Sequence, residues 1–193
     1  VRYQPVPVGD VPGGATLYNP RTLERDLPRI AAIGANTALL QLPDQAVLDA
    51  CAERGLWAIP VIPVPAGADL GDTDVREGLV ADVAGYVTEF SDHPAVLMWC
   101  VGDEGDAAQH EAADWYSFLS AAAWAAYDAE GAAYHPVTAI NDGLIGLPEH
   151  ADAADGLDLW GLAYRGYDTF DTQDGESTLF ADFAMLETGK PCW

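Results

Sequence analysis

The sequence has very few basic side chains. Only 8 Lys and Arg stand against 31 Asp and Glu, which gives a formal net charge of -23, and Lys190 is the only lysine. A surface of this charge repels nucleic acid and anionic membranes, so neither is expected as a partner. The acidic residues are spread among apolar segments and do not form one block, which argues against a disordered acidic tail.

A chain that is acid-rich and lysine-poor, with half of its residues hydrophobic, has the composition expected of a protein that lives in strong brine. In molar salt the Debye length falls to about 3 Å, and most of the repulsion between surface carboxylates disappears. The sequence therefore predicts a halophilic source, with an acidic protein from ordinary conditions as the alternative. The sequence does not decide between a secreted and a cytoplasmic location.

Cysteines and long apolar runs are also scarce. Cys51, Cys100 and Cys192 lie far apart in apolar segments, form neither a disulfide framework nor a metal-ligand spacing, and are expected to be buried thiols. No apolar run approaches the roughly 20 residues that span a bilayer, and no signal-peptide pattern opens the chain. G-x-G-x-x-G, P-loop and G-x-S-x-G motifs are absent, which disfavours nucleotide binding and a serine nucleophile. No cofactor and no metal are expected.

What the chain does contain is a regular alternation of hydrophobic runs and amphipathic segments. Continuous apolar runs, typical of strands buried on both faces, are expected as strands at Val1–Val6, Thr37–Leu42, Trp57–Val64, Val96–Val101, Val137–Ile140, Leu159–Ala163 and from Pro191 onward. Helices with start and stop signals are expected between them, at 20–33, 45–54, 79–90, 115–130 and 179–188, with a weaker candidate at 144–154.

Six strand–helix units followed by the start of a seventh strand predict a parallel sheet. Two architectures fit this pattern, a doubly wound open sheet and a (β/α)8 TIM barrel, and the missing glycine-rich motif weakens the first. No linker divides the chain, so residues 1–193 are expected to form a single α/β domain, an incomplete TIM barrel.

In a parallel barrel the functional side chains gather where the strands end. The predicted ends are Tyr3-Gln4, Gln41, Pro63-Val64, Asp103-Glu104, Asn141-Asp142 and Tyr164-Arg165. Carboxylates and amides can bridge sugar hydroxyls, and aromatic rings can stack on sugar faces. The sequence therefore predicts a saccharide-binding rim.

The stretch from Asp92-His93-Pro94 to Gly102-Asp103-Glu104 resembles the fourth-strand motif of retaining (β/α)8 glycosidases, glycoside hydrolase clan A, which reads His-Pro, an apolar run with Trp, then Gly-Asn-Glu. Three further stretches are similar to family 2 barrels and β-1,3-glucanosyltransferases in the same order: Tyr3-Gln4-Pro5 with Gly34-Ala35-Asn36-Thr37, Leu159 to Gly166, and Gly189-Lys190-Pro191.

The resemblance implies a glycoside hydrolase or transglycosidase that acts on a β-linked, glucan-like saccharide by a retaining mechanism with two carboxylates. Glu104 would be the acid/base. The residues expected to line the sugar site are Tyr3, Gln41, Asp103, Asn141, Tyr164 and Arg165.

Four features depart from the family pattern. The chain stops at Trp193, before the position of the nucleophilic glutamate, and Asp103 replaces the usual Asn. Leu39 stands where an arginine is common, and an Asn is missing between Leu162 and Tyr164. The chain alone is therefore expected to be inactive and to belong to a longer enzyme. A degenerate or purely carbohydrate-binding barrel is the alternative.

Overall fold

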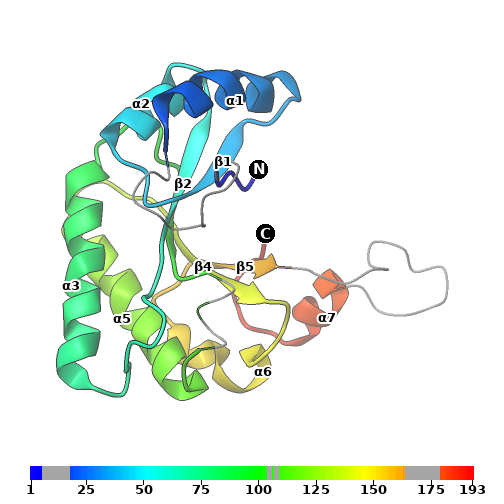
Figure 1. The fold of residues 1–193 in the computed structure, drawn as a ribbon. Helices are drawn as coiled ribbons and strands as arrows, with labels where there is room; N and C mark the ends of the chain where they lie inside the picture. Colours follow the sequence, from blue (N-terminus) through cyan, green and yellow to red (C-terminus); the bar gives the residue numbers. More distant parts are fainter. Residues whose placement is uncertain (6–17, 104–105, 107–108, 164–178) are drawn as a thin grey trace.

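The computed structural model describes residues 1–5, 18–103, 106, 109–163 and 179–193 (Figure 1). The elements in chain order are α1 (Pro20–Ala32), β1 (Thr37–Gln41), α2 (Gln45–Ala52), β2 (Trp57–Ile62), α3 (Thr73–Phe90), β3 (Trp99–Val101), α5 (Ala112–Glu130), β4 (Val137–Asp142), α6 (Leu147–His150), the 3-10 helix η1 (Ala151–Ala154), β5 (Leu159–Ala163) and α7 (Leu179–Met185).

All five strands pair in parallel and in the order of the sequence, β1-β2-β3-β4-β5. The N-terminal segment extends this order beside β1, where Arg2 bridges Leu39. At the other side Cys192 bridges Trp160 of β5. A doubly wound sheet would reverse its strand order at a switch point, and this sheet does not. The described chain is therefore a parallel α/β half-barrel, as in a partial TIM barrel.

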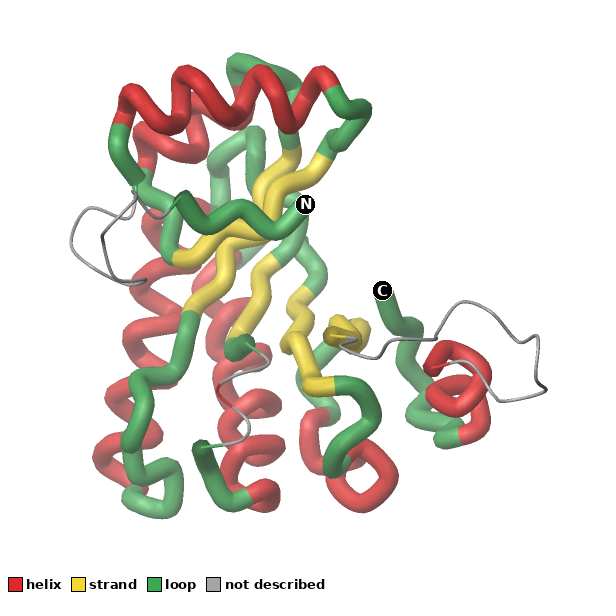
Figure 2. The backbone as a smooth tube through the Cα atoms, turned by 45° about the vertical axis from the view of Figure 1, so that its right-hand side comes forward, coloured by secondary structure: helices red, strands yellow, loops and turns green. Residues whose placement is uncertain are grey.

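The helices lie around the outside of the curved sheet, and both ends of the chain approach its inner side (Figures 1 and 2). The main core lies between the helices and the sheet and includes Leu40, Trp99 and Leu119. A second apolar cluster lies on the inner face, made of Leu39, Ile59, Val61, Cys100 and Ile140. Neighbours such as Leu39 and Leu40 belong to different clusters because successive strand residues point to opposite faces.

The helix starts follow the capping signals of the sequence. The Asn19 side chain accepts a hydrogen bond from Arg21 N at 2.9 Å with Pro20 in the first turn, and Asp44 accepts from Val47 N at 3.0 Å. These oxygens satisfy backbone N–H groups that have no partner inside the helix. α1 contains Pro28 in its interior and continues past it to Ala32.

Several predicted elements differ from the structure. The strand expected from Pro191 onward is a single bridge at Cys192, the helix expected at 79–90 begins at Thr73, and the strand expected at Trp57–Val64 ends at Ile62. The expected strand Val1–Val6 is reduced, over residues 1–5, to the single bridge at Arg2. The strand β3 covers only Trp99–Val101. Before it Val96 makes a single parallel bridge to Ala58 of β2, and its own N–H donates to His93 O at 3.0 Å. The weak helix at 144–154 divides into α6 and η1.

Gly102 ends β3 in a conformation that requires glycine. Its φ of 91° lies in the left-handed region, and a Cβ atom there would come within 2.5 Å of Trp115 Cη2 on α5. The close approach of this backbone to α5 fixes the direction in which the chain leaves the strand towards Asp103.

A buried carboxylate joins β3 to the end of α5. Glu130, 7% exposed, accepts hydrogen bonds from Trp99 Nε1 at 2.6 Å and from the backbone N–H of His135 at 2.9 Å. Its Oε1 also lies 2.5 Å from His135 Nδ1. Three polar groups of the core therefore depend on one side chain.

Candidate functional site

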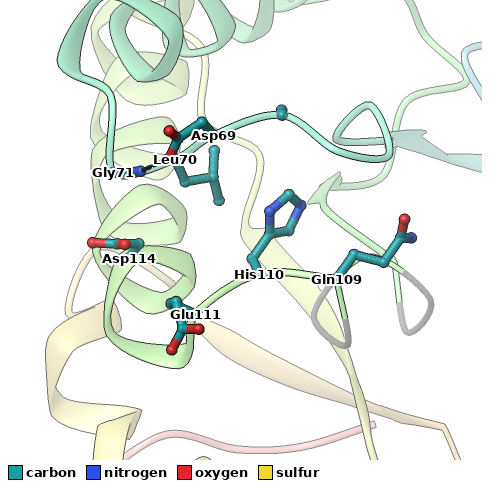
Figure 3. Close-up of a pocket in the computed structure, with 8 residues that line it drawn as sticks. Asp69, Leu70, Gly71, Gln109, His110, Glu111 and Asp114 are labelled. Atoms are coloured by element: carbon teal, nitrogen blue, oxygen red, sulfur yellow. Dashed lines mark hydrogen bonds between the residues drawn. The ribbon is translucent and has the colours of Figure 1, made fainter.

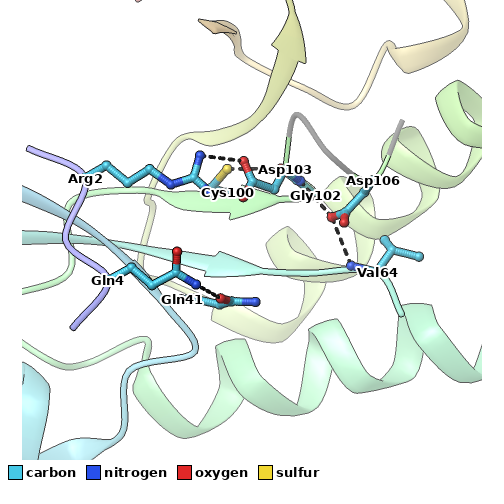
Figure 4. Close-up of polar contacts among 8 residues, drawn as sticks. All are labelled: Arg2, Gln4, Gln41, Val64, Cys100, Gly102, Asp103 and Asp106. Atoms are coloured by element: carbon cyan, nitrogen blue, oxygen red, sulfur yellow. Dashed lines mark hydrogen bonds and ion pairs between the residues drawn. The ribbon is translucent and has the colours of Figure 1, made fainter. Parts of the chain in front are cut away.

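An ion pair crosses the inner side of the sheet at its C-terminal edge (Figure 4). Arg2 Nη1 donates to Asp103 Oδ1 at 3.2 Å, and Arg2 Nη2 donates to Asp103 Oδ2, so the contact is bidentate. Arg2 comes from the N-terminal segment and Asp103 follows β3. The guanidinium offsets the negative charge of the Asp103 carboxylate.

Asp106 holds the ends of β2 and β3 together. Its Oδ2 accepts hydrogen bonds from Asp103 N at 2.9 Å and from Val64 N at 3.2 Å (Figure 4). Burial raises the pKa of this carboxyl above its ordinary value, although the two N–H donors act in the opposite direction. Asp103 and Asp106, which flank Glu104 in the sequence, are therefore both held by polar contacts.

Replacing Asp106 with asparagine is expected to change how stability depends on pH. The amide oxygen can still accept both hydrogen bonds, and the buried charge is removed. Because the pKa of Asp106 is raised in the folded state, the folded chain binds this proton more readily than the unfolded chain, and the stability so gained is lost as the pH rises. Urea titrations of wild type and D106N are compared from about pH 4 to 7. As the pH increases, the free energy of unfolding of D106N should rise relative to that of wild type. A difference independent of pH would contradict this assignment.

A cleft of about 740 Å³ opens beside Asp106 between the ends of β1 and β2 and the helix α3. Its lining residues are Gln41, Leu42, Ile62, Pro63, Val64, Pro65, Ala66, Leu79, Asp82, Val83, Tyr86, Asp106 and Phe118. Gln41 accepts from Gln4 Nε2 through Oε1 at 3.1 Å. Mostly apolar walls with a few polar groups, in this size range, are typical of sites for small ligands.

Two predicted site residues lie at this edge, and a third points elsewhere. Gln41 lines the cleft and Asp103 lies beside it. The hydroxyl of Tyr3 instead donates to Asp26 on α1 at 3.1 Å, and burial raises the pKa of this phenol. The reason is the two-residue period of an extended chain: Arg2 and Gln4 face the inner side, so Tyr3 faces the helices.

Asn141 is used inside the fold. It is 3% exposed, and its Nδ2 donates to Gly143 O and Ile145 O, both at 3.0 Å. Its Oδ1 accepts from the Tyr116 hydroxyl at 3.1 Å. Both N–H donors of this amide are occupied, and they hold the turn after β4. The side chain of Asn141 therefore serves the fold and has no donor left for a sugar hydroxyl.

The remaining predicted residues, Glu104, Tyr164 and Arg165, lie outside the described residues, and their roles stay predictions. Arg2 and Asp106 are the site residues that the sequence reasoning missed. Arg2 has a usable signal, since a polar residue one step before Tyr3 must face the opposite side of the strand.

A second pocket, of about 310 Å³, lies where the chain enters α5 (Figure 3). It is lined by Asp69, Glu111 and Asp114, and by His110, whose ring stacks on Trp115 at 5.5 Å with its Nε2 buried and unpartnered. Within the described ranges no group of three or more His, Cys, Asp or Glu side chains could hold a metal ion. We therefore assign no metal site to this pocket.

Among the residues that the structure describes, no helix is both long enough and apolar enough to cross a membrane.

No protein-family model matches the sequence, and no curated protein matches it either. Solved structures do match in fold. A Bacteroides uniformis β-glucuronidase aligns over 91% of this chain and 22% of its own, with a TM-score of 0.70 and 15% identity. A GH2 β-galacturonidase from Eisenbergiella tayi, bound to galacturonate, aligns over 91% and 32%, with a TM-score of 0.67 and 16% identity.

An endo-1,4-β-mannanase from Eisenia fetida aligns over 79% of this chain and 63% of its own, with a TM-score of 0.62 and 15% identity. The chain spans about a fifth of the length of the β-glucuronidase and about a third of that of the β-galacturonidase. At these identities the likeness is one of fold, a parallel α/β sheet with its strands in sequence order as in a partial TIM barrel.

Proposed function

We propose that this chain forms the acid/base part of a retaining glycoside hydrolase or transglycosidase, within a longer protein, that acts on a neutral β-linked saccharide. The observation that carries the proposal is the C-terminal edge of the half-barrel. There Asp103 and Asp106 flank Glu104 in the sequence and lie beside a cleft. Asp103 is held by the ion pair with Arg2, and Asp106 by the hydrogen bond from Asp103 N. The shared fold with β-glucuronidase, β-galacturonidase and β-mannanase structures agrees with it.

The mechanism needs two carboxyl groups about 5 to 5.5 Å apart. In the proposal Glu104 protonates the oxygen of the leaving sugar and later takes a proton from the incoming water or sugar hydroxyl. A second carboxylate, expected after the strand that Cys192 begins, attacks the anomeric carbon. Asp106 and the Arg2–Asp103 pair do not react. Their proposed role is to hold Asp103 and Asp106, the described residues that flank the acid in the sequence.

A neutral sugar suits the charges at this edge better than a uronic acid. The cleft and its surroundings contain Asp82, Asp103 and Asp106, and the guanidinium of Arg2 is already bound to Asp103. A sugar carboxylate would meet net negative charge there, whereas hydroxyl groups can donate to these oxygens. This separates the proposed substrate from those named for the β-glucuronidase and β-galacturonidase.

The test is the stereochemistry of the first product. The full-length protein that carries this chain is incubated with a β-glucan or β-mannan, and the reducing end released is followed by proton NMR before mutarotation. We expect the β-anomer first, and we expect an aryl β-glucuronide to be turned over at least about tenfold more slowly than the matching aryl β-glucoside. Early release of the α-anomer would exclude the retaining mechanism. Binding of the glycan without turnover would identify a non-catalytic barrel instead.

A further inference from the structure

An exposed group of aromatic rings lies on the far side of the molecule from the cleft. We call Trp124, Tyr127 and Tyr134 the aromatic platform. Trp124 and Tyr127 belong to α5, and Tyr134 lies in the loop before β4, at the N-terminal edge of the sheet. Trp124 is 54% exposed and Tyr134 is 64% exposed. Neighbouring aromatic side chains that are exposed to this degree offer a surface on which a ligand can stack.

The rings of the platform are held in fixed positions. Trp124 and Tyr127 lie 5.7 Å apart at 64°, and Tyr127 and Tyr134 stack at 6.0 Å and 7°. The Tyr134 hydroxyl donates to Asp158 Oδ1 at 3.0 Å, and the Tyr127 hydroxyl donates to Oδ2 of the same carboxylate. Trp124 Nε1 donates to Asp155 Oδ1 at 3.4 Å.

Backbone packing also fixes the indole. A Cβ atom on Gly156 would lie 3.1 Å from Trp124 Cδ1 and 2.7 Å from Ser120 O, so only glycine lets this turn approach the helix. The polar ends of the three rings are therefore held by Asp155 and Asp158, while the side chains of Trp124 and Tyr134 stay exposed. Rings ordered before binding lose little conformational entropy when a ligand covers them.

The charges around the platform select the kind of ligand. Asp152, Asp155 and Asp158 lie close to Lys190, whose amine donates to the carbonyl oxygens of Asp155 at 2.8 Å and Leu157 at 2.5 Å. The one lysine is thus bound to the backbone, and the carboxylates dominate. A polyanion would be repelled, whereas a sugar ring can place its C–H face on the electron-rich rings and its hydroxyls on the carboxylates.

We propose that the aromatic platform is a second carbohydrate site, which holds a neutral β-linked polysaccharide at a distance from the catalytic edge. The inference rests on the proposed function for its choice of sugar. The site itself is separate, since no residue of the platform lines the cleft. A polymer held there would keep the protein close to its substrate between turnovers.

The experiment measures binding without turnover. Affinity electrophoresis of the full-length protein in gels with barley β-glucan, glucomannan or polygalacturonate is compared for wild type, Trp124→Ala, Tyr134→Ala and Trp57→Ala. Trp57 is the matched control, because it is 45% exposed at the start of β2 and lies outside the platform. Thermal unfolding confirms that each variant is folded.

We expect retardation by a neutral glycan to weaken about 5- to 10-fold in the two platform variants and to stay unchanged in Trp57→Ala. Polygalacturonate should retard no form of the protein. Equal retardation of Trp124→Ala and wild type would overturn the second site, whether or not the protein turns glycans over. If the platform variants differ from wild type in sedimentation coefficient but not in retardation by glycans, the surface binds a protein partner. That result would also overturn the second carbohydrate site. Loss of binding in Trp124→Ala with no turnover in wild type would leave the second site standing and remove the proposed enzyme.

Discussion

Replacing Glu130 with alanine is expected to lower the free energy of unfolding by about 3–5 kcal/mol. The carboxylate accepts from Trp99 Nε1 and from the backbone N–H of His135, and its Oε1 lies beside His135 Nδ1. Trp99 is completely buried, so its indole N–H cannot turn to water when the acceptor is removed. The measurement is urea denaturation followed by far-UV circular dichroism, in molar salt.

Two further variants separate hydrogen bonding from helix effects. Glu130→Gln keeps one acceptor oxygen in place of two, so an intermediate loss of about 1–2 kcal/mol is expected. Asp128→Asn changes an exposed acid in the same turn of α5 and should alter stability by less than about 0.5 kcal/mol. A Glu130→Ala variant as stable as Asp128→Asn would show that the buried contacts contribute nothing.

Glu104→Gln is expected to reduce kcat on a native β-glucan by about 10²- to 10⁴-fold, because glutamine cannot donate a proton to the leaving oxygen. An aryl β-glycoside with a good leaving group needs little acid assistance, so its kcat/KM, which reports formation of the glycosyl-enzyme, should fall much less. Its kcat still falls, because Glu104 also acts as the base in the second step. The alkaline limb of the pH profile, where the acid loses its proton, should disappear on the glucan. Steady-state kinetics of the full-length protein on both substrates provide the measurement.

The control for this prediction is Glu89→Gln, an exposed acid on α3 away from the strand ends. It should leave both rates unchanged. Unchanged turnover of the native glucan by Glu104→Gln would show that Glu104 is not the acid/base. The motif resemblance would then no longer support a catalytic role. Equal losses on both substrates would instead point to disturbed folding or binding.

The order of elements was predictable because local signals and periodicity agree. Asn19 before Pro20 and the Asp44 cap marked helix starts, and continuous apolar runs marked strands that are covered on both faces. Parallel pairing in sequence order then follows from alternating strands and helices. How many residues of an edge segment pair with the sheet could not be predicted, as residues 1–5 of the expected strand Val1–Val6 illustrate. Pairing at an edge depends on the adjacent strand, about which the local sequence pattern says nothing.

The candidate site was predictable only in part. Gln41 and Asp103 lie where the strand ends suggested, whereas Tyr3 and Asn141 face the helix side. A strand end locates a residue along the strand, and only the two-residue period decides which face its side chain occupies. Asp106 could not be singled out, because one acid among 31 Asp and Glu carries no local signal.

Lys190 has a practical consequence for this molecule. Because it is the only lysine, a reagent that acylates ε-amino groups has a single side-chain target, and that amine is bound to two carbonyl oxygens in the turn before β5. Acylation must wait for those contacts to break. Burial lowers the pKa of Lys190 while the amine is in place, and once released into water the amine reacts as an ordinary lysine does. The labelling rate thus reports how often the segment leading to Cys192 separates from the turn before β5.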